Sequence, residues 1–338
     1  MRTWPRLTPL APHAEALADA ADQAGIADPT ASLMDRLGTL RQFKAQFARA
    51  EPLYRRALAI DEASLGADHP NLAIHLNDLA TVLQATNRQA EAEPLMRRAL
   101  TIDEASLGAD HPDVARNLNN LAMLLQATNR LAEAEPLMRR ALAIDEASLG
   151  ADHPDVARNL NNLAVLLQAT NRLAEAEPLM RRALTINEAS LDADHPDVAI
   201  RLSNLTRVLK ATNRGQEGEP LVRRALAILE ASLGPDHPLT GRIGANLADV
   251  LDRIGQTAEA RERFRRALAI LAAQVRAIGR AHPWHDEAER DYRAFLAAQG
   301  EAEPAIDAEI AAARSETGLP ISDPRPRNTK NPLSSLSL

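Results

Sequence analysis

The sequence predicts an all-α protein, an α-solenoid built from stacked antiparallel helix pairs. Three observations support this class. The phrase DHPDVARNLNNLA begins at Asp110 and returns unchanged at Asp152, which gives a repeat of 42 residues. Apolar residues make up 45% of the chain but aromatic residues only 2%, and Ala and Leu, both good helix formers, supply most of the apolar content. Within one repeat, the apolar spacing fits two helices.

A His-Pro pair marks each repeat. The pairs are His69-Pro70, His111-Pro112, His153-Pro154, His195-Pro196, His237-Pro238 and, three residues late, His282-Pro283. Residues 111–152 and 153–194 agree at 38 of 42 positions. Because recent duplication alone can produce such likeness, the repeat indicates a stacking unit and is no measure of selection on single residues.

The first helix of a repeat is expected from about Pro112 to Asn129. Proline suits a first helical position, where its missing N–H would have no partner in any case. Asp110 and Asp113 flank this start, where the helix dipole favours negative charge. The spacing i, i+3, i+4, i+7 then predicts one buried stripe, formed by Leu118, Leu121, Ala122 and Leu125.

The second helix is expected from about Leu131 to Leu149. Pro136 falls near its first turn, where proline is tolerated. Gly150 follows the end, where a left-handed cap is usual, and the fourth repeat has Asp192 there, which visits that region at moderate cost. The residues expected to be buried are Ala134, Met138, Ala141 and Leu142 or their neighbours.

The pattern divides the chain into three parts. Residues 1–11 are expected to be a flexible N-terminus, and residues 318–338, rich in proline and serine, a disordered tail. Between them, residues 12–317 form the array. It holds about five 42-residue repeats at 70–280, a preceding partial unit at 29–69 and a degenerate helix pair at 283–317, and an Ala-rich helix at about 12–26 is expected to cap its beginning.

The spacing of these residues resembles the tetratricopeptide repeat family. The apolar and small residues that match the family pattern are Leu118, Leu121, Ala122, Leu125, Ala134, Met138 and Ala141. The family's usual period is about 34 residues. With its longer second helix, and with the phrases LNNLA, AEPLMRRALAI and LGADHPDVA, this chain is similar to the kinesin light chain family. The resemblance implies a right-handed superhelix whose first helices line a concave groove.

The resemblance also implies which residues would line that groove and bind a peptide. They are Asn77, Arg116, Asn119, Asn120, Met123, Gln126, Arg158, Asn161, Asn162, Val165, Gln168 and Asn204. Asparagine is a mediocre helix former, and its amide both donates and accepts hydrogen bonds, which suits a partner's backbone. The alternative is that the asparagines hydrogen-bond between adjacent repeats and hold the stack. The sequence leaves both interpretations open.

Several other classes of function find no support. The chain has no cysteine, which excludes thiol chemistry, and its net charge of −7 gives no electrostatic case for nucleic acid binding. Equivalent histidines of neighbouring repeats should lie roughly 16–20 Å apart, too far to share a metal ion, so we interpret them as helix-start residues. Pairs such as Asp145-Glu146 and Arg139-Arg140 are interpreted as a solvated, ion-paired face. We therefore expect no catalysis, cofactor or metal.

No apolar run reaches the roughly 20 residues of a membrane span, and the N-terminus lacks the apolar core of a signal peptide, so a cytoplasmic protein is expected. The first functional hypothesis is a scaffold that binds a peptide or protein segment in its groove. The alternatives are a self-associating rod, hence a homo-oligomer, and a sensor or adaptor module whose effector is on another chain.

Overall fold

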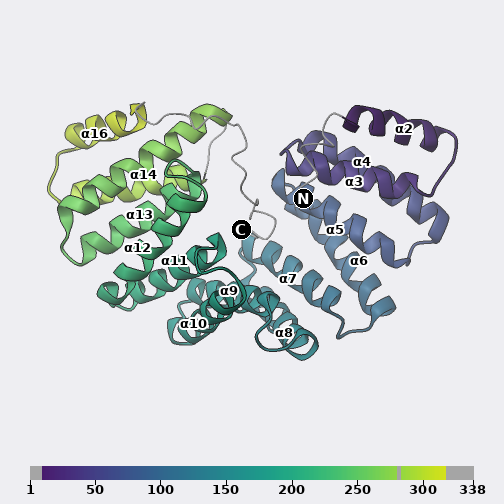
Figure 1. Cartoon of the computed structure of the whole chain (residues 1–338), viewed down its shortest axis with the longest axis horizontal. Helices are drawn as coiled ribbons and strands as arrows, with labels where there is room; N and C mark the ends of the chain where they lie inside the picture. Colours follow the sequence, from purple (N-terminus) through teal and green to yellow (C-terminus); the bar gives the residue numbers. More distant parts are fainter. Residues whose placement is uncertain (1–9, 280–282, 317–338) are drawn as a thin grey trace. The chain divides into compact units, whose positions relative to one another are not determined.

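The computed structural model describes residues 10–279 and 283–316. This part contains fifteen helices and no strand, and successive helices run antiparallel (Figure 1), so the predicted all-α class is confirmed. The predicted disordered tail at 318–338 lies outside the described residues. So does the predicted flexible N-terminus, except that residue 11 already begins a helix.

The chain divides into two compact units, residues 1–166 and 167–338, and the boundary falls inside α9 (Pro154–Ala169). The first unit contains α2 (Ala11–Gln23), α3 (Thr30–Phe43), α4 (Phe47–Leu65), α5 (Pro70–Ala85), α6 (Gln89–Leu107), α7 (Pro112–Ala127) and α8 (Leu131–Leu149). The second contains α10 (Leu173–Ser190), α11 (Pro196–Ala211), α12 (Gly215–Ser232), α13 (Pro238–Arg253), α14 (Thr257–Ile278), α15 (Pro283–Ala298) and α16 (Glu303–Ser315).

The first helix of each repeat ends two residues earlier than predicted. Helix α7 ends at Ala127, and Asn129 takes a left-handed conformation with φ of 60°. The Arg130 N–H then donates to the Leu125 carbonyl at 2.8 Å and closes the turn. Asparagine adopts this conformation more readily than most residues. The equivalent residues are Asn87, Asn171 and Asn213, with φ of 63°, 59° and 59°.

The connection between repeats differs from the predicted left-handed cap. Gly150 has φ of 91° and ψ of 154°, a positive-φ conformation outside the left-handed helical region that glycine alone adopts easily. Asp192, at the equivalent place, is absent from the residues with positive φ. There α10 ends at Ser190 and Leu191 is extended, with φ of −118° and ψ of 165°. The expectation of left-handed backbone at Asp192 was therefore wrong.

The predicted core is confirmed with one exception. The stripe of Leu118, Leu121, Ala122 and Leu125 is fully buried, as are Ala134, Met138 and Ala141 of the second helix. Leu142 is only half-buried, and Ile144 takes its place. Each buried leucine contributes about 1.5–3 kcal/mol through removal of apolar surface from water.

The two ends of the array depart from the repeat. At the start, α2 packs on α3 through Ala18, and Glu15 of α2 accepts a hydrogen bond from Arg41 at 2.7 Å. At the other end, Phe264, Tyr292 and Phe295 form an aromatic cluster with ring centroids 5.3–6.2 Å apart. Repeat arrays need atypical terminal units of this kind to cover the last apolar face.

Candidate functional site

The predicted groove residues fall into two groups by burial. Three asparagines are buried, with exposed fractions of 3%, 5% and 7%: Asn119, Asn161 and Asn162. The others in the first unit are exposed or partly exposed, and we call them the first-helix face: Asn77, Arg116, Asn120, Met123, Gln126, Arg158 and Val165. Gln168 and Asn204 are partly exposed and belong to the second unit.

Several asparagines of the first helices join neighbouring repeats. Asn162 on α9 donates its amide to the Asn119 carbonyl oxygen on α7 at 3.1 Å. Asn77 on α5 donates to the side chain of Asn117 on α7 at 2.8 Å and to its own helix at the Ala73 carbonyl. These bonds bring the first helices of consecutive repeats side by side. Contact between repeats and binding of a partner are both compatible with these positions, and the role of the asparagines in binding stays a prediction.

A second inter-repeat bond was not predicted from the sequence. Asn117 donates to Asp103 at 2.6 Å and Asn159 donates to Asp145 at 2.8 Å, so each bond connects a second helix to the first helix of the next repeat. Burial raises the pKa of both carboxyl groups, and the asparagine amides oppose part of that rise. The interpretation of Asp145 as a solvated residue was wrong, because it is 2% exposed. Asp145 lies on the same buried face of the helix as Ala134, and the spacing between the two residues could have predicted its burial.

The two arginines of the first-helix face form ion pairs within their own helices. The Arg116 side chain is 51% exposed and pairs with Asp113, one turn earlier on the same helix, at 2.9 Å. Arg158 is 27% exposed and pairs with Asp155 in the same way at 2.8 Å. An ion pair as exposed as that of Arg116 contributes little to stability, so this guanidinium group can exchange its partner for a ligand carboxylate. Arg158 is more buried, and its Nε is shielded from solvent. Met123 lies about two turns after Arg116 on α7 and is partly exposed.

The second helices carry a saturated ion-pair network instead. Arg139 pairs with Glu135 on its own helix at 2.7 Å. Arg140 reaches the preceding repeat, where it bonds Glu104 and the Ala109 carbonyl oxygen. The expectation of an ion-paired face is therefore confirmed for these arginines.

The repeated histidines begin helices, as predicted. The Nδ1 atom of His111 accepts the Asp113 backbone N–H at 3.2 Å. His69, His153, His195 and His237 make the same contact. Burial lowers the pKa of His237, which favours the neutral ring that can accept this bond.

The second unit presents different side chains on its own first helices. The Arg242 guanidinium of α13 lies 4.4 Å from the centroid of the Trp284 ring on α15. Burial and the neighbouring cation of Arg207 on α11 lower the pKa of Arg242. Lys210 and Asp249 form an ion pair between α11 and α13. Arg242 and Trp284 were not predicted from the sequence, because the fifth and sixth His-Pro repeats diverge most from the pattern.

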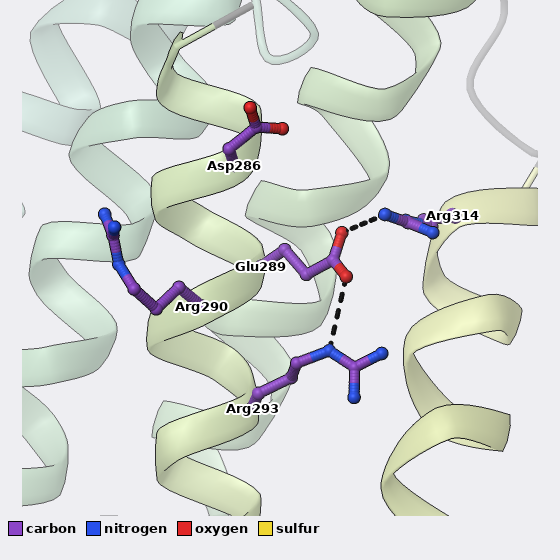
Figure 2. Close-up of a pocket in the computed structure, with 5 residues that line it drawn as sticks. All are labelled: Asp286, Glu289, Arg290, Arg293 and Arg314. Atoms are coloured by element: carbon purple, nitrogen blue, oxygen red, sulfur yellow. Dashed lines mark hydrogen bonds and ion pairs between the residues drawn. The ribbon is translucent and has the colours of Figure 1, made fainter.

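A cleft of about 350 Å³ lies at the last helix pair, lined by Asp286, Glu289, Arg290, Arg293 and Arg314. Figure 2 shows Glu289 between two of these arginines. It bonds Arg293 on its own helix at 3.2 Å and Arg314 on α16. Because Glu289 pairs with an arginine on each helix, we interpret the cluster as an ion-pair contact that holds α15 and α16 together.

Two structural properties bear on other classes of function. Among residues 10–279 and 283–316, no group of three or more histidine and carboxylate side chains could hold a metal ion. None of the helices in this part of the chain combines the length and apolar character of a transmembrane span.

Helical hairpins that repeat every 42 residues and pack on their neighbours define a helical-repeat protein. The family model for the tetratricopeptide repeat matches residues 29–105, 90–147, 113–189, 155–217 and 204–273. The chain therefore belongs to the tetratricopeptide repeat family. Its members are generally non-catalytic, and the fold is typical of scaffolds for protein interaction.

Solved structures share the fold of the chain. One, from Podosopora anserina, is named as a kinesin light chain with nearly identical TPR-like repeats; at 27% identity and a TM-score of 0.52, the match covers 61% of this chain and 98% of that one. Another is BtubC (BKLC) from P. vanneervenii, at 27% identity and a TM-score of 0.57, covering 68% and 91%. The apo form of RapI, at 17% identity and a TM-score of 0.56, covers 71% and 82% and shares the fold alone. No curated protein matches the sequence.

Proposed function

We propose that the protein is a non-catalytic scaffold that binds an extended segment of another protein along the first-helix face. One observation carries the proposal. Arg140 of the second helix is bonded to Glu104 of the preceding repeat, whereas the ion pairs of Arg116 and Arg158 lie within their own helices. The ion pairs of these two first-helix arginines do not join repeats, so their charges can be offered to a ligand.

The chemistry of the face suggests the kind of segment. Arg116 and Arg158 stand 42 residues apart on neighbouring first helices and suit a ligand with at least one acidic residue. Asn120 and Gln126 offer amides to a peptide backbone, and Met123 provides a small apolar seat.

Selection of random 12-residue peptides displayed on phage tests this proposal. A selected peptide is then titrated by fluorescence anisotropy against wild type, the double variant Arg116→Ala/Met123→Ala, and Arg139→Ala. The first variant should bind about tenfold to a hundredfold more weakly. Arg139 is a matched control because its side chain is 47% exposed and lies on a second helix. Equal affinity for all three proteins, or selection of no peptide, would refute the proposal.

Self-association is the second candidate. It is favoured by apolar side chains left exposed near the start of the array, Leu10 at 55%, Leu17 at 64% and Ile26 at 50%. Light scattering decides it: a monomer at micromolar concentration excludes the self-associating rod, and a concentration-dependent mass supports it.

A further inference from the structure

Two junctions between consecutive first helices follow one rule. A side chain on one first helix meets a side chain 43 residues later on the next. At one junction these are Asn119 and Asn162, with an N–O distance of 3.1 Å. At another they are Ser203 and Asn246, at 2.9 Å. Neutral groups thus form both contacts.

The first junction breaks the rule, because the same two positions are Asp35 on α3 and Asp78 on α5. Neither residue is fully exposed. A carboxylate has only acceptors, so two carboxyl groups at these positions can hydrogen-bond to each other only when the pair holds a proton. When both groups are ionised, their like charges repel.

A buried histidine extends the cluster to a third helix. His75, 6% exposed, lies 2.9 Å from Asp35 through Nδ1 and 3.0 Å from Asp61 of α4 through Nε2. Both ring nitrogens can donate to carboxylates only when the ring is protonated. One cluster of ionisable groups therefore ties α3, α4 and α5 together.

We propose that the junction of α3, α4 and α5 is a proton-controlled joint, closed while Asp78 and His75 hold their protons and loosened when they lose them. The proposal does not depend on the peptide-binding function. It gives the first repeat a response to pH that the asparagine junctions, which carry no titratable group at these positions, do not share.

The electrostatics of the cluster agree with the geometry. Burial and the Asp35 carboxylate raise the pKa of Asp78 to about 7, against smaller opposing effects of His75 and of Arg116 from α7. Burial by itself favours a lower pKa for His75, but Asp35 and Asp61 outweigh this effect, so the pKa of His75 is raised. From α4, Tyr54 also faces the pair, and burial keeps its hydroxyl protonated by raising its pKa.

The sign of the pH effect is the same for both groups. A group whose pKa is raised by folding stabilises the folded form below its ordinary pKa and loses that contribution as the pH rises through the folded value. For Asp78 the loss runs from about pH 4 to just above 7, and for His75 it begins above the ordinary value near 6.5. The joint should be closed in mild acid and loosen through neutrality.

Hydrogen exchange of the full chain, corrected for the intrinsic pH dependence of exchange, tests the joint. Between pH 6 and pH 8, protection of α3 and α4 should fall by about tenfold or more relative to α7 and α8, which serve as the internal control. The variant Asp78→Asn should remove most of this fall, because its amide donates to Asp35 at every pH. Asparagine also occupies the equivalent position in the following repeats, so the variant is expected to fold.

Two results would overturn the proposal. One is a parallel change of protection in both pairs of helices across this pH range. The other is an undiminished fall in Asp78→Asn, while Asp110→Asn, an exposed carboxylate removed as a control, behaves as wild type.

Discussion

Replacing Asn117 by alanine tests whether buried polar bonds hold the repeats together. The side chain is 1% exposed, donates to Asp103 at 2.6 Å and accepts from Asn77 at 2.8 Å. A hydrogen bond to a charged group contributes about 1.5–3 kcal/mol and a neutral one about 0.5–1.5. The variant loses both bonds and leaves a buried carboxylate without its donor. We expect a loss of about 2–4 kcal/mol in the opening free energy of α6 and α7.

Native-state hydrogen exchange measures this loss locally, which matters because an array of repeats need not unfold in one step. Asn120→Ala is the matched control, since this residue lies on the same helix and is partly exposed. It should change the opening free energy by less than about 0.5 kcal/mol.

The pH dependence of the same variant separates a polar bond from simple packing. Burial raises the pKa of Asp103, and removal of Asn117 takes away a group that holds it down. The carboxyl group should then protonate more readily, so the loss in Asn117→Ala should be smaller at pH 5 than at pH 7.5. Adding Asp103→Asn, the residue found at the equivalent Asn187, should recover part of the loss. A loss below about 1 kcal/mol, or one that does not vary with pH, would refute this account.

Two further changes have defined outcomes. Leu121→Ala, in the core of its repeat, should lower the free energy of unfolding by about 2–5 kcal/mol. Hydrogen exchange should show the loss of protection in that repeat and its neighbours, and equal opening of every repeat would contradict nearest-neighbour stacking. Ala45→Gly should raise the melting temperature of the first repeat, because Ala45 has φ of 55° and the left-handed region costs a non-glycine residue about 1–2 kcal/mol. An unchanged or lower melting temperature in thermal unfolding would show that the backbone at this residue is unstrained.

The sequence was sufficient to predict the helix pairs because the period and the apolar spacing are local signals. The stripe through Leu118 and Leu125 is buried as expected, and α8 has the predicted bounds. Turn geometry was harder to predict, since Asn129 continues the helical pattern in sequence but adopts positive φ in the structure.

Whether a given polar residue is buried or exposed could not be predicted from spacing alone. Asn119 and Asn120 are adjacent in the sequence, yet one is buried at a repeat junction and the other is partly exposed. Likewise Asp145 and Glu146 follow one another, and only the first is buried. Which of two neighbouring polar residues meets the next repeat depends on how the repeats pack, and helical period does not specify that.

The bonds between repeats recur at fixed distances along the chain. Second-helix arginines such as Arg98 and Arg140 reach back 36 residues, and the aspartate-to-asparagine bonds reach forward 14. A gene duplication that inserts one more 42-residue copy would therefore supply each new side chain with its partner already in place. The interior of such a chain can lengthen or shorten by whole copies without compensating mutations. Its first repeat, with Asp35 and Asp78, and its aromatic end cannot be exchanged in this way, so length can change in evolution while the two ends stay fixed.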